Sequence, residues 1–130
     1  AYDVEEKKIS VQVNAQSLTI EADEPLLRQA LFNLVLNAVQ AAEPEGRIEV
    51  RVQRTDDGAL LEVCDNGPGV LPEHRNEIFK PYFTTNPAGT GLGLAVVKQI
   101  VLAHGWEIQC LANEPRGAIF RISHLKVVSS

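Results

Sequence analysis

Hydrophobic and polar residues alternate with a period of two along several short stretches of the chain, as is typical of β-strands with one buried face. These stretches cover residues 9–13, 18–21, 47–54, 59–65, 106–112 and 118–123. Between the third and fourth stretches lies Thr55-Asp56-Asp57-Gly58, whose residue types favour a tight turn. We therefore expect these two stretches to form a hairpin.

Apolar residues recur at helical spacing in two longer stretches. Residues 26–42 contain no helix breaker, Asp23 is well suited to cap the helix, and Pro25 is tolerated in its first turn. The sequence Glu43-Pro44-Glu45-Gly46 then predicts its end. We also predict a short helix over residues 72–79, a loop over 81–89 and a second long helix over 92–104.

The order of these elements predicts the fold class. Strands that follow one another with helices interposed favour an α+β domain, in which helices cover one face of a mixed sheet. With 130 residues, the chain is long enough for one domain with its own hydrophobic core. We assign the domain to residues 9–124, a polar linker from an upstream region to 1–8, and a C-terminal tail to 125–130.

Charge and composition exclude several kinds of function. A net charge of −5 argues against binding to nucleic acid. No apolar run approaches the roughly 20 residues that span a bilayer, and no stretch resembles a secretory leader, so we expect a cytoplasmic domain. Cys64 and Cys110 lack the spacing of zinc ligands and are expected to be buried thiols. A chain that begins with Ala1 and contains no methionine is expected to be part of a longer protein.

The predicted strand that ends at Asp65 is followed by glycine-rich sequence, Asp65-Asn66-Gly67-Pro68-Gly69. A carboxylate at this position could accept a hydrogen bond from the amino group of adenine, and Gly67 and Gly69 would leave room for the base. The alternative is that these residues form only a structural turn.

A second glycine-rich sequence, Gly89-Thr90-Gly91-Leu92-Gly93-Leu94, comes at the start of the second long helix. It has the glycine spacing of dinucleotide-binding folds, but a polar loop rather than a strand precedes it, and the chain contains no P-loop motif. We expect a mobile loop that closes onto the helix N-terminus, where the N–H groups of Gly91 and Gly93 meet phosphates. Phe79 and Phe83 are predicted to anchor this loop to the core.

Four amide side chains recur at helical spacing on one face of the first long helix: Gln29, Asn33, Asn37 and Gln40. Apolar residues rather than charges flank this stripe, which indicates the wall of a cleft. Magnesium prefers oxygen ligands, and an amide oxygen supplies one without adding negative charge beside a triphosphate. Asn37 is the predicted Mg²⁺ ligand, supported by Asn33. The alternative is that these amides only hydrogen-bond neighbouring loops.

Four motifs follow one another along residues 9–123: N-L-V-L-N-A from Asn33, D-N-G-P-G from Asp65, I-F-K-P-Y-F-T-T from Ile78, and G-T-G-L-G-L from Gly89. In order and spacing they resemble the ATP-binding catalytic domain of sensor histidine kinases. The sequence of the third motif, F-T-T with a short loop after it, is most similar to that of the nitrogen-regulation branch of the family.

This resemblance implies a Bergerat-type two-layer α/β sandwich, with a mixed, mostly antiparallel sheet of about five strands covered on one face by about three helices. It implies that ATP and Mg²⁺ bind, with Asp65 on the adenine amino group and Asn33 and Asn37 on the phosphates and the metal. The implied nucleotide-binding residues are Asn33, Asn37, Asp65, Gly67, Gly69, Thr85, Gly89, Thr90, Gly91, Leu92 and Gly93. The side chains of Leu92 and Leu94 are expected to pack in the core.

The resemblance also implies a kinase rather than an ATP-hydrolysing enzyme. Hydrolysing members of the superfamily carry a glutamate where this chain has Asn33, and an amide cannot act as a general base. We assign no catalytic residue within the chain, and expect structural or surface roles for His74, His104 and His124. The phosphoacceptor histidine is expected on an upstream dimerisation domain of an intact homodimer, which signals to a response regulator and can be anchored in a membrane.

Two other functions stay open at this point. One is an ATP-hydrolysing conformational clamp of the topoisomerase or chaperone type, and the other is a nucleotide-binding regulatory module without catalysis. Two positions also depart from the family pattern, because Asn86 stands where relatives often have lysine and Trp106 where many have glycine. The first change removes a cationic contact with phosphate, which Lys80 could replace.

Overall fold

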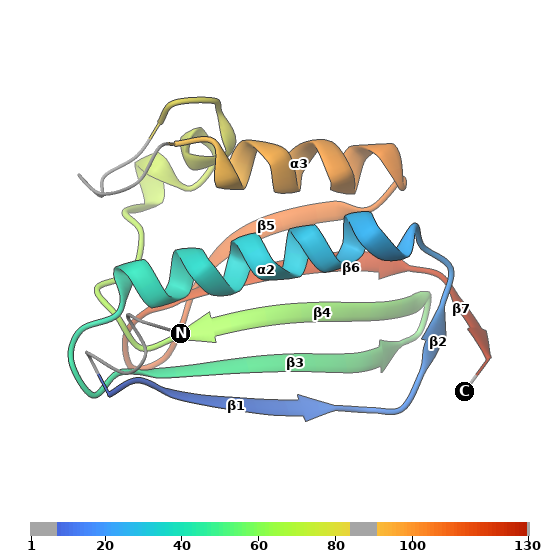
Figure 1. Cartoon of the computed structure of the whole chain (residues 1–130), viewed down its shortest axis with the longest axis horizontal. Helices are drawn as coiled ribbons and strands as arrows, with labels where there is room; N and C mark the ends of the chain where they lie inside the picture. The colour runs from blue at the N-terminus through green and yellow to red at the C-terminus, as the bar shows by residue number, and fades with distance from the viewer. Residues whose placement is uncertain (1–7, 84–90, 130) are drawn as a thin grey trace.

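The computed structural model describes residues 8–83 and 91–129 (Figure 1). Its elements follow the chain in the order β1 (Ser10–Ala15), β2 (Thr19–Ile20), α2 (Glu24–Ala41), β3 (Arg47–Thr55), β4 (Gly58–Asp65), the 3-10 turns η1 (Pro72–His74) and η2 (Glu77–Phe79), α3 (Gly93–Ala103), β5 (Glu107–Ala112), β6 (Ala118–Leu125) and β7 (Val127–Ser129). Each predicted strand and long helix is present, and the predicted short helix consists of two separate 3-10 turns.

Within the described residues, five strands form one sheet in the order β1-β3-β4-β6-β5. β1 pairs with β3 in parallel, whereas the other neighbours pair antiparallel, and β3 and β4 form the predicted hairpin. β2 and β7 form a separate antiparallel pair. Residues 127–129, which the sequence pattern places in a tail, therefore belong to a strand.

The helices α2 and α3 pack side by side on one face of the sheet (Figure 1). The core lies between the two layers and contains fully buried side chains from both, including Leu34 of α2, Val97 of α3, Val63 of β4 and Phe120 of β6. Burial of a side chain of this size contributes about 1.5–3 kcal/mol relative to an exposed position. The predicted two-layer α+β sandwich is thus confirmed.

Local sequence explains where α2 begins and ends. The side chain of Asp23 accepts a hydrogen bond from the N–H of Leu26 at 3.1 Å, as predicted for an N-cap, and Pro25 lies in the first turn. The helix ends at Ala41, two residues before Glu43, because the ring of the following Pro44 disfavours helical geometry at Glu43.

The C-terminal end of α3 is joined to the start of α2 through His104. Its Nδ1 lies 2.8 Å from the carbonyl oxygen of Ile100, and its Nε2 accepts a hydrogen bond from the N–H of Asp23 at 3.0 Å. The imidazole ring stacks on the buried Trp106, with ring centroids 4.1 Å apart. Trp106, one of the two departures from the family pattern, therefore supports this junction between the helices.

The edge strand β1 is more exposed than its alternating pattern predicts. All of its residues are exposed, including Val13 at 71%. Val11 and Val13 lie in register with the buried residues Ile48 and Val50 of β3. The prediction of a half-buried strand is wrong because β1 forms the edge of the sheet farthest from the helices (Figure 1).

Both cysteines are buried and free, as predicted, and burial raises the pKa of each thiol to about 11. In the part of the chain that the structure describes, no helix has the length and hydropathy needed to cross a membrane.

Candidate functional site

Asp65 is the last residue of β4 and is only 4% exposed. Its Oδ1 accepts hydrogen bonds from the N–H of Gly67 at 2.9 Å and from the N–H of Ala118 at 3.2 Å. Burial raises the pKa of this carboxyl, and the two backbone hydrogen bonds oppose that rise only in part. Among the described residues, none donates a hydrogen bond to Oδ2, so this oxygen is the acceptor left for a ligand.

The glycines that follow Asp65 are required by the packing of their own loop. A side chain at Gly67 would begin 3.2 Å from the carbonyl oxygen of Ala41, at the end of α2. Gly69 has a φ of +81°, and a side chain there would begin 3.0 Å from the carbonyl oxygen of Gly117. The turn interpretation therefore accounts for both glycines, and their contact with a nucleotide stays a prediction.

The turn of residues 113–117, between β5 and β6, supports this loop, although the sequence pattern does not point to it. Asn113 donates from Nδ2 to the backbone oxygen of Asp65 at 2.8 Å, and Arg116 donates from Nε to the carbonyl oxygen of Gly67 at 2.9 Å. A side chain at Gly117 would begin 1.9 Å from the backbone oxygen of Asp65, so only glycine fits. The one available signal was Gly117, which lies between the predicted strands 106–112 and 118–123; the contacts themselves follow from the pairing of β4 with β6.

Asn33 brings the amide face of α2 to the start of α3. Its Nδ2 donates to the carbonyl oxygen of Gly93 at 3.2 Å, which leaves its Oδ1 as an acceptor. Asn37 lies about one turn further along α2 and is partly exposed. Its side chain has no hydrogen-bonding partner among the described residues. The structure thus places Asn33 beside the start of α3, with Asn37 about one turn further along α2.

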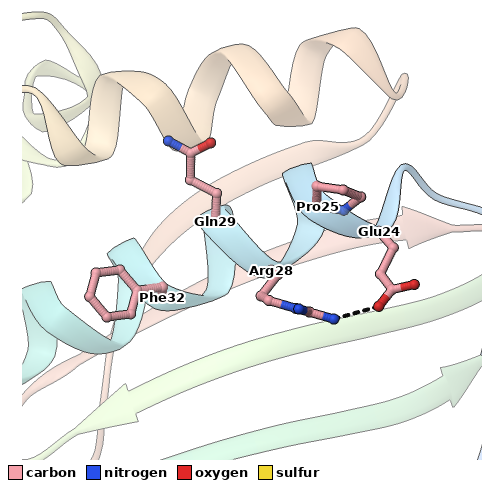
Figure 2. Close-up of a pocket in the computed structure, with 5 residues that line it drawn as sticks. All are labelled: Glu24, Pro25, Arg28, Gln29 and Phe32. Carbon is pink, nitrogen blue, oxygen red and sulfur yellow. Dashed lines mark hydrogen bonds and ion pairs between the residues drawn. The ribbon is translucent and has the colours of Figure 1, made fainter.

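Gln29 lies apart from this arrangement. It lines an open groove of about 540 Å³ that Figure 2 shows along the first turns of α2, together with Glu24, Pro25, Arg28 and Phe32. Gly67 packs instead against the last turn of this 18-residue helix, which is about 27 Å long. The predicted stripe of amides is therefore divided, because only part of it faces the glycine segments.

The two glycines near the start of α3 differ in what the fold demands of them. Gly91 has a φ of +77° and accepts a hydrogen bond from the N–H of Tyr82 at 2.8 Å, and a side chain would begin 2.6 Å from the backbone of Tyr82. Gly93 is the first residue of α3, and no described atom lies within 4 Å of the point where a side chain would begin. Packing among the described residues therefore does not explain Gly93, whereas a phosphate bound at the helix N-terminus would occupy this space.

Predictions for the residues around this segment have mixed outcomes. Phe79 is buried and contacts Phe120 edge to face, and Phe83 packs against the core, as predicted. Leu94 also packs against the core, but Leu92 is 40% exposed, so its predicted core role is wrong. Leu92 precedes the first turn of α3 and so lies outside the buried helix face. The described residues do not include Thr85, Asn86, Gly89 and Thr90.

The three histidines have structural or surface roles, as predicted. His74 contacts the ring of Phe83 edge to face, and the exposed His124 lies between two carboxylates. His104 joins α3 to α2.

Known proteins resemble this chain in both sequence and fold. Residues 22–129 match the family model described as histidine kinase-, DNA gyrase B-, and HSP90-like ATPase. The chain is 40% identical over 123 residues to the sensor histidine kinase ZraS of Salmonella typhimurium, an alignment that covers 92% of this chain and 26% of ZraS. It is also 40% identical over 109 residues to the nitrogen regulation protein NtrY of Azorhizobium caulinodans, covering 78% of this chain and 14% of NtrY.

A solved structure extends the comparison to three dimensions. Full-length ShkA in complex with AMPPNP superimposes with a TM-score of 0.87 at 32% identity, covering 99% of this chain and 28% of that one. The chain thus spans about a quarter of the length of ZraS and of ShkA. The family match covers most of the chain and includes the motifs around Asn33, Asp65 and Gly91. The chain therefore belongs to the histidine kinase-, DNA gyrase B-, and HSP90-like ATPase family, as a catalytic ATPase domain of the sensor histidine kinase type.

Proposed function

We propose that this domain binds Mg·ATP and donates the γ-phosphoryl group to a histidine on a separate dimerisation domain of a sensor histidine kinase. The observation that carries this proposal is the hydrogen bond from Asn33 to the carbonyl oxygen of Gly93, which joins the amides of α2 to the glycine-rich start of α3. Amide oxygens that can bind a cation therefore come from α2, and N–H groups that can bind phosphate come from the adjacent start of α3.

The adenine end of the site is supported by Asp65. This residue is only 4% exposed, its Oδ2 lacks a donor among the described residues, and the amino group of adenine supplies one. Once a ligand covers this oxygen, leaving it unpaired would cost about 1–3 kcal/mol, and more when it is charged, so a ligand that donates to it is strongly preferred. This preference would select adenine over guanine, which carries an oxygen where adenine carries its amino group.

The phosphate end of the site fits a magnesium ion bound together with the nucleotide. Asn37 and Asn33 each have an amide oxygen without a donor among the described residues, and Mg²⁺ favours such oxygen ligands while it also contacts phosphate. Mg²⁺ would neutralise part of the phosphate charge when bound. The Nζ of Lys80 pairs with both carboxylate oxygens of Glu77 at 3.0 Å, which partly offsets its charge in this structure.

The chemistry of these side chains favours transfer over hydrolysis. An amide at Asn33 cannot take a proton from water, so the site holds ATP without activating a water molecule. An imidazole nitrogen of the acceptor histidine would attack the γ-phosphorus, a new N–P bond would form, and the bond to the bridging oxygen would break to release ADP. The conformational-clamp function is accordingly not favoured.

The acceptor domain requires a surface close to the phosphates. Tyr82 is 76% exposed, and its N–H bonds to the carbonyl oxygen of Gly91, the neighbour of the exposed Leu92. These two apolar side chains therefore lie beside the predicted phosphate segment, where an upstream dimerisation domain would present its histidine. The intact protein would then act as a homodimer and pass the phosphoryl group to a response regulator.

Titration calorimetry with ATP, ADP and GTP, each with and without Mg²⁺, tests the binding step. The wild-type chain should prefer ATP to GTP and should bind ATP more tightly with Mg²⁺. Asp65→Ala should abolish the preference for adenine, whereas Asn37→Ala should reduce mainly the effect of Mg²⁺. Equal affinities of the wild type and both variants for all nucleotides would contradict the proposal.

A further inference from the structure

Arg116 connects three segments of the chain around Asp65. It belongs to the turn between β5 and β6, its Nε donates to the carbonyl oxygen of Gly67 at 2.9 Å, and its Nη2 lies 2.8 Å from Oε1 of Glu43. Glu43 follows the C-cap of α2, and Gly67 lies in the loop after β4. One guanidinium group thus spans the end of α2, the loop after Asp65 and the 113–117 turn.

Gly67 is held through both of its peptide groups. Its N–H donates to Oδ1 of Asp65, and its carbonyl oxygen accepts from Arg116. Because the same residue takes part in both bonds, a shift of the Gly67 carbonyl would also move the N–H that orients the Asp65 carboxylate. Arg116 therefore acts on Asp65 through Gly67, without touching the carboxylate.

Two other contacts that hold this loop do not involve the side chain of Arg116: Asn113 bonds to the backbone oxygen of Asp65, and the N–H of Ala118 bonds to its carboxylate. We therefore expect the fold to form without this arginine. The side chain of Arg116 is 55% exposed and that of Glu43 is 59% exposed, so their ion pair contributes little to stability. The bond from Nε to the buried Gly67 is the contact that matters, and Glu43 keeps the guanidinium in place.

We propose that Arg116 is a positioning residue for adenine recognition, which fixes Gly67 and thereby aims the Asp65 carboxylate at the amino group of the purine. This inference rests on the proposed function. It extends that function to a residue outside the nucleotide-binding motifs, on the turn between β5 and β6.

Four variants test the role of Arg116. Arg116→Met removes the charge and every donor while keeping the apolar stem, Arg116→Lys keeps the charge but lacks a donor at the Nε position, and Glu43→Gln removes only the ion pair. The matched control is Arg28→Gln, which removes an exposed arginine paired with Glu24 in the first turns of α2. Each variant is titrated with ATP, ADP and GTP, with and without Mg²⁺, and its melting temperature is measured without ligand.

We expect Arg116→Met and Arg116→Lys to lower the affinity for ATP and ADP by about three- to tenfold, the effect of one lost hydrogen bond. The factor should be the same with and without Mg²⁺, because the amides of α2 are unchanged, and the preference for ATP over GTP should fall. Glu43→Gln should have a smaller effect than either arginine variant. Arg28→Gln should bind like the wild type, and all four variants should keep the wild-type melting temperature to within a few degrees.

Three results would overturn the inference: wild-type affinity in Arg116→Met, full affinity in Arg116→Lys, or an affinity loss that leaves the ATP-to-GTP preference intact and follows a fall in melting temperature. The last pattern would show a purely structural role. A wild-type chain that binds no ATP would instead contradict the proposed function itself, so the two failures are distinguishable.

Discussion

At the residue scale, the site depends on a carboxylate whose two oxygens differ. Oδ1 of Asp65 is held by backbone N–H groups of Gly67 and Ala118, whereas Oδ2 has no donor among the described residues. Because the group is buried and no described cation pairs with it, its ionised form is costly in the unliganded protein. The ionised carboxylate therefore lowers the stability of the domain, and in the proposed function its free oxygen serves as the acceptor for adenine.

Replacing Asp65 by asparagine separates the effect of the buried charge on stability from its proposed role in binding adenine. The amide oxygen can still accept from Gly67 and Ala118, but an NH₂ group replaces Oδ2 and opposes the amino group of adenine. We expect Asp65→Asn to lower ATP affinity by about 10- to 100-fold and to raise the free energy of unfolding of the unliganded chain. Calorimetry and urea denaturation measure the two effects, and wild-type affinity in this variant would contradict the assignment of Asp65.

The raised pKa of Asp65 predicts opposite pH dependences of stability and binding. Since its pKa is higher in the folded than in the unfolded chain, folding favours the protonated form. The stability of the wild type relative to Asp65→Asn should therefore be greatest below the unfolded pKa and fall as pH rises through the folded pKa. Over the same interval the ATP affinity relative to that variant should rise.

Urea denaturation and ATP titrations of both proteins between about pH 4 and pH 8 measure this dependence. The ratio of wild type to variant removes the titration of ATP itself. A ratio of ATP affinities that stays constant until pH falls into the range of an ordinary aspartate would show that the pKa is not raised.

Asp65 was predictable from the sequence because its signal is local: a strand ends there and glycines follow. Arg116 and Asn113 were not predictable, since their contacts with this loop arise only when β6 pairs with β4. The sequence motifs therefore point to the residues of the proposed site. They do not identify the groups that hold those residues in place.

At the element scale, hydrogen bonds connect both ends of α3 to α2 or to the residue that precedes it. Asn33 of α2 bonds to Gly93 at the first residue of α3, and His104 at its end bonds to the N–H of Asp23 before α2. These contacts require that the two helices run antiparallel, and they fix the distance between the amides and the glycine-rich segment.

The His104 junction should contribute measurably to stability. His104→Ala removes an acceptor for Asp23, a contact with the carbonyl of Ile100 and the stacking on Trp106. We expect it to lower the free energy of unfolding by about 1–3 kcal/mol. His124→Ala is the control, because that histidine makes only exposed ion pairs and should have a smaller effect. Equal urea midpoints for the two variants would contradict this account of the junction.

The glycines at the start of α3 predict opposite responses to alanine. Gly93→Ala should leave the free energy of unfolding within about 0.5 kcal/mol of the wild type, because no described atom opposes its side chain. It should nevertheless weaken ATP binding. Gly91→Ala should destabilise the chain by about 1–3 kcal/mol, since its φ is +77° and Tyr82 lies too close. Urea denaturation and calorimetry measure both, and unchanged ATP affinity in Gly93→Ala would remove the assigned role of Gly93.

Elements with strong local signals were predicted well. The N-cap at Asp23 and the breaker at Pro44 set the limits of α2, and the Asp56-Asp57 turn set the β3–β4 hairpin. The exposure of β1 was not predictable, because it depends on which strands the helices cover. The pairing of β2 with β7 was missed for a similar reason, since both strands are very short and meet only in the folded chain.

At the scale of the whole molecule, the order of motifs predicted the fold and the family. The proposed site draws on α2, the end of β4 and the start of α3, which lie far apart in the sequence. The comparisons confirm the family, and the domain spans 26% of ZraS. The proposed function assigns the acceptor histidine to a separate dimerisation domain.

Phosphoryl transfer between separated domains tests the central claim most directly. The chain is mixed with Mg²⁺, ATP labelled on the γ-phosphate and the dimerisation domain of the intact protein, and the label on each protein is measured over time. We expect label on the histidine of the dimerisation domain, strongly reduced transfer with Asp65→Ala or Asn37→Ala, and neither self-labelling nor rapid phosphate release by the chain alone. Rapid hydrolysis without the acceptor, or unlabelled acceptor with a chain that binds ATP tightly, would contradict the claim.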